Sequence, residues 1–279
     1  MDVYRLPIGQ GIEAGIDFFV DNFSFATKAF SEVTENGMDI MVNVMMFFPP
    51  WVLILVFTGL AWFLSKKRGI AAFTGIGLLL IWNMDLWEPT ISTLALIIIA
   101  VLFAIMIGIP LGILSALSEV AYRIITPILD VMQTMPAFVY LIPAIPFFGL
   151  GAVGAIFSTV IFSVPPCIRL TCLGIKQVPK ELVEAADAFG SSKSQKLFKL
   201  QLPMAKTTMM AGINQTIMLA LSMVVIAAMI GAKGLGGEVW KAIQRLEPGR
   251  GFEAGIGIVI VAIILDRVMQ RVGGGKQTA

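Results

Sequence analysis

The chain has 279 residues, of which 57% are hydrophobic and only 14% are charged, and its formal net charge at pH 7 is +2. Soluble domains usually carry about a quarter charged residues, so this composition indicates a protein of the lipid bilayer. The small net charge gives no electrostatic reason to expect nucleic-acid binding. Because histidine is absent, the commonest metal ligand and the usual general base are missing, and we expect no metal site.

The first 43 residues predict an amphipathic N-terminal region rather than a membrane span. No basic segment followed by an apolar run opens the chain, so no cleavable signal peptide is evident. Ile12, Ile16, Phe19 and Phe23 recur at helical spacing, with acidic residues on a separate stripe. Such helices normally lie in the membrane interface. A helix packed on the rest of the protein is an equal alternative.

Seven candidate spans follow, because a spanning helix needs about 20 predominantly apolar residues. They are placed at 45–64, 69–87, 91–117, 128–148, 151–171, 207–231 and 254–270. The third and sixth are the clearest, whereas Pro165-Pro166 is expected to interrupt the fifth. The sequence therefore predicts an all-α membrane bundle. We divide it into residues 1–43, two accessory helices in 44–90, a core of five helices in 91–271, and a short tail, 272–279.

The distribution of basic residues predicts how the chain is oriented, because lysine and arginine favour the cytoplasmic side. With the N-terminus outside, the cytoplasmic segments are 65–68, 118–127, 169–206 and the chain after 266. These segments hold 14 of the 20 basic residues and leave six outside. We therefore expect the N-terminus outside and the C-terminus in the cytoplasm.

The longest cytoplasmic loop, 172–206, is predicted to form two short helices rather than a plain linker. Pro179 can occupy the first turn of a helix, and Gly190 stands where a left-handed residue commonly ends one. Ser191 or Ser192 can cap the second helix. An amphipathic helical elbow between two spans is a docking surface for a partner protein.

A spaced motif occupies this loop and carries a resemblance to a known family. Its residues are Glu184, Ala185, Ala186, Gly190, Leu200, Leu202 and Pro203. The pattern E-A-A, three residues, G, nine residues, I, one residue, L-P resembles the EAA loop of bacterial ABC importer permeases, the binding-protein-dependent inner-membrane family. Leu200 replaces the isoleucine, a change that conserves volume. An ordinary helical hairpin is the alternative interpretation.

This resemblance implies that segment 176–203 is a coupling loop that docks on an ATP-hydrolysing subunit. Glu184 would make polar contacts there, Ala185 and Ala186 would allow close approach, and Gly190 would form the turn. It further implies partners in the membrane of a bacterium: an ATP-binding subunit that carries ATP and Mg, an extracytoplasmic substrate-binding protein, a second copy of this chain, and membrane lipid. No cofactor is expected in this chain.

Further stretches resemble the glycine betaine/proline (osmoprotectant) branch of these permeases. They are residues 130–143, 174–179, 211–215, 218–228 and 231–236. The choline/carnitine branch has a different run after its Q-T-x-P, which favours glycine betaine. The resemblance thus implies a type I ABC importer permease for glycine betaine, with proline betaine or proline as further solutes, serving osmoprotection. A permease for choline or carnitine is the alternative.

Polar residues within the spans are candidates for a translocation pathway. Asn214, Gln215 and Ser222 lie on the sixth span, and Gln133 and Tyr140 lie on the fourth. Polar side chains in spans also hydrogen-bond neighbouring helices, so a structural role is an equal alternative for each of them.

Two other classes of protein fit the sequence less well. An enzyme that hydrolyses ATP needs a phosphate-binding loop with a lysine, and 231–237 lacks that lysine position. An ion-coupled carrier often has carboxylates at membrane depth, whereas Asp85, Asp130 and Asp266 fall near predicted span ends. We therefore expect a transporter subunit that is not itself an enzyme.

Overall fold

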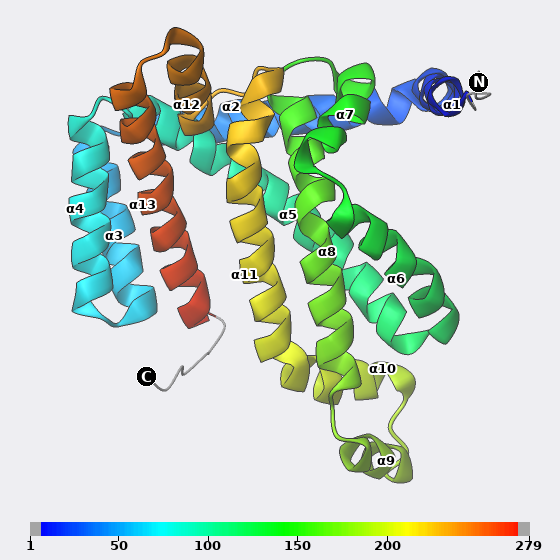
Figure 1. The fold of residues 1–279 in the computed structure, drawn as a ribbon. Helices are drawn as coiled ribbons and strands as arrows, with labels where there is room; N and C mark the ends of the chain where they lie inside the picture. Colours follow the sequence, from blue (N-terminus) through cyan, green and yellow to red (C-terminus); the bar gives the residue numbers. More distant parts are fainter. Residues whose placement is uncertain (1–6, 273–279) are drawn as a thin grey trace, which may run out of the picture.

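The computed structural model describes residues 7–272, and every regular element within that range is helical. In chain order these are α1 (Ile8–Asn22), α2 (Ser24–Phe47), α3 (Pro50–Ser65), α4 (Arg68–Asn83), α5 (Trp87–Leu117), α6 (Glu119–Thr134), the 3-10 turn η1 (Ala137–Tyr140), α7 (Leu141–Phe148), α8 (Ala152–Lys176), α9 (Lys180–Ala188), α10 (Lys193–Lys196), the π-helical turn η2 (Leu197–Gln201), α11 (Leu202–Ala227), the 3-10 turn η3 (Ala228–Ile230), α12 (Leu235–Arg245) and α13 (Pro248–Val272). Figure 1 shows α9 and α10 at one end of the bundle, hereafter the elbow end, and α12 at the other.

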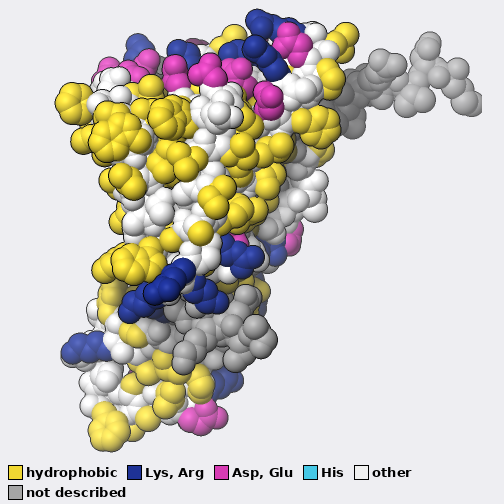
Figure 2. Space-filling model, turned by 90° about the vertical axis from the view of Figure 1, so that its left-hand side faces the viewer, with side chains coloured by type: hydrophobic (Ala, Val, Ile, Leu, Met, Phe, Trp, Pro, Cys, Tyr) yellow, Lys and Arg dark blue, Asp and Glu magenta, His cyan; other side chains and the backbone are white. Residues whose placement is uncertain are grey.

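Three helical stretches of the described chain are each long and apolar enough to cross a membrane. They are Trp87–Leu117, Ala152–Lys176 and Lys193–Ile230, and two bent helix pairs meet the same criterion when each pair is taken together. On the face drawn in Figure 2, hydrophobic side chains form a broad band beneath a charged upper rim, and Lys and Arg gather below it. Such a band between charged ends suits a protein that spans a bilayer.

Helices α5, α8 and α11 form the centre of the bundle, and glycines set the close approach between them. A Cβ atom at Gly112 of α5 would lie 2.6 Å from the Cβ of Thr171 on α8. On the other side of α8, a Cβ at Gly212 of α11 would lie 3.0 Å from the carbonyl oxygen of Pro166. Small residues at these positions let neighbouring backbones pack directly against one another, as is usual in membranes.

The expected interruption of the fifth span at Pro165-Pro166 was wrong, because α8 continues through both prolines to Lys176. Both prolines are buried, and the backbone of Pro166 lies against α11 at Gly212. Proline is tolerated inside membrane helices where neighbouring helices pack against the altered turn. Tertiary packing therefore holds this helix together where local propensity alone predicts a break.

The span predicted at 128–148 is not one continuous helix, because the chain bends by 113° between α6 and the η1–α7 segment; that this segment crosses the membrane stays a prediction. Met135 ends α6 with φ −71° and ψ 136°, and Pro136 follows at φ −58° and ψ 139°. A residue before proline is driven out of the helical region by the proline ring. The predicted span is therefore two helices joined at a sharp corner.

The N-terminal part of the chain wraps the end of the bundle opposite the elbow. Figure 1 shows α2 lying across the bundle at this end, with α1 beyond it. The centre of the Phe30 ring on α2 lies 5.0 Å from the centre of the Phe103 ring on α5 and 5.3 Å from the centre of the Phe148 ring on α7. Thr34 and Met38 are buried, so α2 packs on the protein. Whether 1–43 also lies in the membrane interface stays a prediction.

Helices α3 and α4 form a hairpin whose turn has Lys66 in the left-handed region at φ 54°. The span predicted at 45–64 starts later than expected, because Phe48 is extended before Pro49 and α3 begins at Pro50. Each helix has 16 residues and is therefore about 24 Å long, less than a hydrocarbon core of about 30 Å. That both helices cross the membrane stays a prediction.

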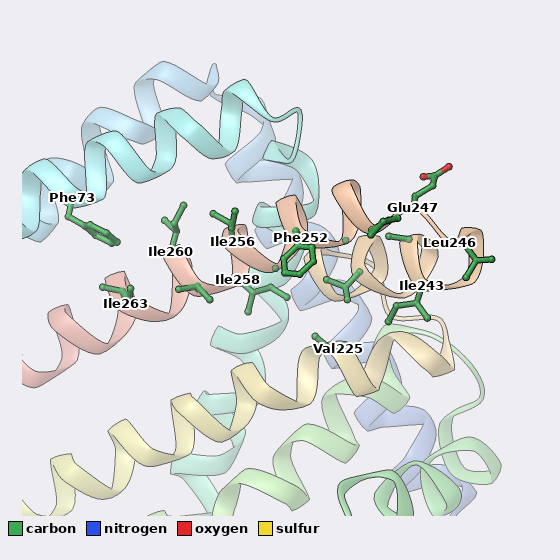
Figure 3. A pocket seen from close by; sticks show the side chains of 16 residues that line it. Phe73, Val225, Ile243, Leu246, Glu247, Phe252, Ile256, Ile258, Ile260 and Ile263 are labelled. Carbon is green, nitrogen blue, oxygen red and sulfur yellow. The ribbon is translucent and has the colours of Figure 1, made fainter.

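Helix α13 joins this hairpin to the core and borders a long apolar groove. It packs against α3 and α4 on one side and α11 and α12 on another. The groove has a volume of about 1080 Å³, and apart from Glu247 its lining is apolar, with Phe73 of α4, Val225 of α11 and Ile260 of α13 among the contributors (Figure 3). Its lining offers almost no hydrogen-bonding groups to a polar solute.

Candidate functional site

Helix α9 carries the first half of the spaced motif and ends as the sequence predicts. Pro179 immediately precedes it, and Gly190 after it has φ 73°. The N–H of Gly190 donates to the carbonyl of Asp187, and the N–H of Ser191 donates to that of Ala186, both at 2.9 Å. This pair of bonds is the Schellman motif, in which a left-handed glycine reverses the chain. The predicted turn at Gly190 is confirmed.

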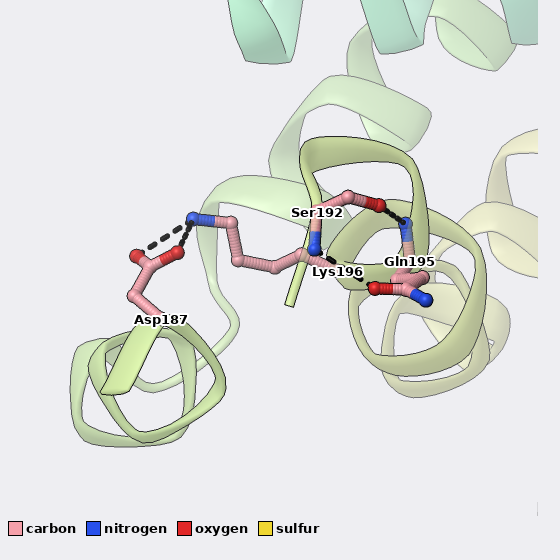
Figure 4. A network of polar contacts seen from close by, with 4 residues as sticks. All are labelled: Asp187, Ser192, Gln195 and Lys196. Carbon is pink, nitrogen blue, oxygen red and sulfur yellow. Dashed lines mark hydrogen bonds and ion pairs between the residues drawn. The ribbon is translucent and has the colours of Figure 1, made fainter. Parts of the chain in front are cut away.

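Helix α10 begins at a capping box that decides between the two candidate serines. The hydroxyl of Ser192 accepts from the backbone N–H of Gln195 at 3.2 Å, and the Gln195 side chain accepts from the Ser192 N–H at 2.9 Å (Figure 4). Two N–H groups that the helix leaves free are satisfied in this way. Ser192 is therefore the cap, and Ser191 belongs to the preceding turn.

A π-helical turn connects α10 to α11 without a break. In this turn the N–H of Leu202 donates to the carbonyl of Leu197, five residues back. Proline inside an α-helix has no N–H and its ring clashes with the carbonyl four residues before it. The wider π turn directly before Pro203 relieves this clash. Residues Lys193–Ile230 therefore form one helical stretch of 38 residues.

The elbow formed by α9 and α10 rests on the ends of the core helices through a small hydrophobic cluster. Ile175, Leu197 and Ala205 are buried together, and Leu202 packs against them. Leu202 of the motif is thus an anchor, while Leu200 is half-buried and Pro203 is exposed. The motif positions differ in role because only part of the elbow faces the bundle.

The outward side of the elbow exposes both the motif and two large aromatic rings. Glu184, Ala185 and Gly190 are exposed, and Ala186 is half-buried. Phe189 is 91% exposed and Phe198 is 63% exposed. Glu184 also borders a recess of about 210 Å³ whose lining includes Lys180 and Gln201. Large exposed aromatic side chains mark surfaces that bind another protein or lipid.

Two of the pathway candidates lie on an exposed face of α11. Gln215 and Ser222 are exposed and seven residues apart, so they lie on one side of the helix two turns from each other. Met218 lies between them and is 40% exposed. Val225, three residues after Ser222, lines the apolar groove. Polar side chains and the groove thus share one face of α11 that this chain leaves uncovered.

Tyr140 and Gln133 do not join this face. Tyr140 is buried, its hydroxyl donates to the carbonyl of Met132, and its ring lies 5.7 Å from that of Phe162. The hydroxyl contact ties η1 back to α6 across the corner, and the ring packs on α8, so both contacts are structural. Gln133 is exposed on α6, near the bend.

Asn214 is engaged within the chain rather than open to a passage. Its Nδ2 donates to Asp266 Oδ1 of α13 at 2.8 Å. Sequence reasoning missed Asp266, because it weighed this residue only as a carboxylate near a span end. The sequence did contain a sign that Asp266 takes part in a hydrogen-bonded group, because Gln270 follows it by one helical turn. The Gln270 amide donates to both Asp266 carboxylate oxygens, at 2.9 and 2.8 Å.

Two ion pairs between α6 and α8 were also missed. Arg169 pairs with Asp130, and Lys176 Nζ lies 3.9 Å from Glu119 Oε2 and 3.5 Å from the centre of the Tyr122 ring. An arginine at the end of an apolar segment is a sign of such a partner. These contacts hold the amphipathic helix α6 against α8 near the elbow end.

Comparison with known proteins identifies close relatives. The chain is 54% identical over 278 residues to the glycine betaine transport system permease protein OpuAB of Bacillus subtilis, covering 98% of this chain and 97% of the relative. It is 54% identical to the glycine betaine/carnitine transport permease protein GbuB of Listeria monocytogenes, covering 91% and 93%. It is 47% identical to the glycine betaine/proline betaine permease protein ProW of Escherichia coli, covering 96% and 75%.

The fold and the family agree with these relatives. A solved structure of the MetNI methionine ABC transporter matches with a TM-score of 0.61 at 21% identity, over 66% of this chain and 92% of that one. The predicted fold class, an all-α type I ABC importer permease, is confirmed. The family model for the binding-protein-dependent transport system inner membrane component matches residues 108–273. The chain therefore belongs to the family of inner-membrane components of binding-protein-dependent transport systems.

Proposed function

We propose that this chain is the permease subunit of an ATP-driven, binding-protein-dependent importer for glycine betaine that serves osmoprotection. The elbow carries the proposal. It presents the exposed Glu184 and Ala185 at the end of two membrane-crossing helices, in a chain whose relatives are glycine betaine permeases. Proline betaine belongs to the same solute class because the relative from Escherichia coli is named for both.

The outward side of the elbow is the docking surface for the ATP-binding subunit. Glu184 offers a carboxylate and Ala185 allows close approach, while the exposed ring of Phe189 offers apolar area at the turn. An aromatic side chain with polar neighbours is the usual anchor of a protein interface. ATP and Mg are bound by that partner, and this chain supplies the surface that responds to it.

The uncovered face of α11 and the groove along α13 support a second copy of the chain as the next partner. Gln215 carries an exposed carboxamide that lipid leaves unsatisfied. Ser222 is exposed on the same face, and its hydroxyl donates to the Met218 carbonyl at 3.0 Å and can still accept from a solute. A homodimer covers the apolar groove and encloses these side chains at its seam, where a small polar solute passes. Gln215 and Ser222 are therefore the pathway residues of this proposal, and Gln133 is a further candidate at the α6 corner.

Orientation follows from the charge of the elbow end. Lys180, Lys193, Lys196 and Lys199 lie on or directly after the elbow helices. Figure 2 shows Lys and Arg gathered beneath the hydrophobic band, on the side of the elbow end, and basic and acidic side chains mixed at the opposite rim. The positive-inside rule assigns the elbow to the cytoplasm. The N-terminus then lies outside and the C-terminus inside, in the plasma membrane of a bacterium.

The mechanism that this arrangement supports is alternating access. When ATP closes the partner subunits, the two docked elbows move together and the seam opens outward to the solute-loaded binding protein. Hydrolysis returns the elbows and opens the seam inward. Residues 91–271 act as the core in this scheme, 176–203 as the coupling loop, and 1–43 and 44–90 as additions around it.

Uptake of radiolabelled glycine betaine into vesicles tests the proposal. The vesicles contain this chain with its ATP-binding and solute-binding partners, with or without internal ATP. We expect uptake that requires ATP and that excess choline inhibits only weakly. Transport of a different solute would keep the importer class and discard glycine betaine, and uptake without ATP would refute the importer itself.

Carnitine is the second candidate solute, because the relative from Listeria monocytogenes is named for glycine betaine and carnitine. It carries the same quaternary ammonium and carboxylate groups. Competition by carnitine in the same vesicles separates the two candidates: equal competition assigns both solutes, and no competition restricts the importer to glycine betaine.

A further inference from the structure

The carboxylate of Asp266 forms the centre of a hydrogen-bonded group between α13 and α11. Asn214 Nδ2 donates to Oδ1 at 2.8 Å, and Gln270 Nε2 lies 2.9 Å from Oδ1 and 2.8 Å from Oδ2. All three side chains are half-buried. Gln270 stands one turn from Asp266 on the same helix, so only the bond to Asn214 connects two helices.

This group lies between two packed helices, where polar contacts are costly to leave unsatisfied. Asn214 stands 12 residues after Leu202, the first residue of α11, which corresponds to about 18 Å along the helix. Its Oδ1 atom is buried without a hydrogen-bond partner among the described residues. An ionisable residue inside a membrane bundle marks a functional site, with its partner named by the contact it makes.

The two helices that this bond connects pack against different parts of the protein. Helix α11 is continuous with α10 and therefore with the elbow. Helix α13 packs on the α3–α4 hairpin and on α12, away from the elbow. The Asn214–Asp266 bond is the side-chain hydrogen bond that joins α11 to α13 among the described residues. A movement of the elbow reaches α13 through this contact and through apolar packing that can slide.

We propose that Asp266 is a positioning residue that holds α11 in register with α13, so that movement of the elbow carries the whole bundle with it. The inference rests on the importer function proposed above and deepens it. With the bond intact, each ATP-driven movement of the elbow moves α11 and α13 together, so that the exposed face of α11 moves relative to the second copy of the chain. With the bond broken, the elbow moves without the bundle, and ATP is hydrolysed without transport.

Exchanging the two side chains tests this directly. Asn214→Asp places two carboxylates against each other, Asp266→Asn leaves two carboxamides, and the double variant restores one carboxylate and one carboxamide in reversed positions. The whole importer is reconstituted with each variant. ATP hydrolysis is measured without solute, and solute uptake is measured per ATP hydrolysed, which does not depend on the amount of protein. Such a cycle isolates the pairwise contribution.

We expect Asn214→Asp to raise solute-independent ATP hydrolysis about fivefold and to lower uptake per ATP about tenfold. Asp266→Asn keeps a weaker hydrogen bond between two carboxamides. It should therefore change both the solute-independent ATP hydrolysis and the uptake per ATP by less than about threefold. The double variant should return both quantities to within about twofold of the unaltered importer.

A double variant that fails to assemble, or whose defect equals the product of the two single defects, overturns the proposal, because the exchange conserves the composition of the pair. An Asp266→Leu variant that assembles with unaltered uptake per ATP would also overturn it. If glycine betaine is the wrong solute, the solute-independent hydrolysis still reports on the pair. An error in the proposed solute is thereby distinguished from an error in this inference.

Discussion

The Nζ atom of Lys196 on α10 lies 2.6 and 2.7 Å from the two carboxylate oxygens of Asp187 on α9 (Figure 4). The pair bridges the turn at Gly190 and fixes the angle between the two arms of the elbow. The side chain of Lys196 is 20% exposed, whereas that of Asp187 is 54% exposed. The contact is therefore partly shielded from solvent on one side only.

Breaking this pair should affect coupling more than folding. Ion pairs at the surface contribute about 0.2–1 kcal/mol, so Lys196→Gln should leave the unfolding temperature of the purified complex nearly unchanged. ATP-dependent uptake should fall on the order of twofold, because the elbow loses its fixed angle. Lys193→Gln is the matched control, since Lys193 is exposed on the same short helix. Equal losses in both variants would contradict a role for the pair.

The left-handed backbone of Gly190 predicts a graded response to substitution. In the left-handed conformation, a residue with a side chain is less stable than glycine by about 1–2 kcal/mol, and asparagine adopts this conformation more readily than other residues. Gly190→Val should weaken association with the ATP-binding subunit by roughly 5- to 30-fold, while Gly190→Asn should retain most of it. Co-purification of the partner subunit measures this. Similar behaviour of the two variants would show that the turn is not what matters.

Close packing between α5 and α8 predicts a stability loss at Gly112. An added methyl group would meet the Cβ of Thr171 at 2.6 Å and the carbonyl of Ile168 at 2.8 Å. Overpacking of this kind costs about 1–3 kcal/mol, so Gly112→Ala should lower the unfolding temperature in detergent. Gly59→Ala on α3 is the control, because nothing lies within 4 Å of its added methyl. It should leave the unfolding temperature unchanged or raise it.

The Tyr140→Phe variant distinguishes a structural role of Tyr140 from a role in the pathway. Removing the hydroxyl in Tyr140→Phe leaves the carbonyl of Met132 without this donor and should cost about 0.5–1.5 kcal/mol of stability. Since Tyr140 is buried and its hydroxyl is engaged by the Met132 carbonyl, the KM for uptake should stay unchanged. A clear rise in KM with an unaltered unfolding temperature would restore Tyr140 as a solute contact.

Accessibility to a charged thiol reagent tests the pathway face of α11. In the assembled importer, Ser222→Cys should react with a membrane-impermeant methanethiosulfonate, and saturating solute should slow the reaction. Ser163→Cys on α8 is fully buried and should stay unreactive, as should the buried native Cys167 and Cys172. An unreactive Ser222→Cys would remove this residue from the passage.

The sequence predicted the elbow well because its signals are local. Gly190, Pro179 and the capping serine each act within a few residues, and backbone conformation there depends little on the rest of the chain. The motif itself lies where the sequence placed it, between two long apolar helices. Local chemistry, however, could not choose between Ser191 and Ser192, because either hydroxyl can reach an N–H at the start of a helix.

The failures concern contacts between distant segments. Hydropathy averages over the corner at Pro136 and so merged α6 with α7, although the residue before that proline favours extended backbone. At Pro165-Pro166 the opposite error arose, because packing against α11 holds a helix that local rules would interrupt. The partner of Asn214 stands 52 residues away, and no periodicity connects two such positions. For Asn214 the sequence therefore left a pathway role and a structural role as equal alternatives.

The unbroken helical stretch from the elbow into the bundle gives the chain a lever. Within that stretch, the straight part is α11, whose 26 residues at 1.5 Å per residue make a rod about 39 Å long. When such a rod pivots about one end, each degree of tilt displaces the other end by about 0.7 Å. A rocking of a few degrees imposed at the docking surface is therefore enough to open or close a passage the width of a small solute at the far side of the membrane.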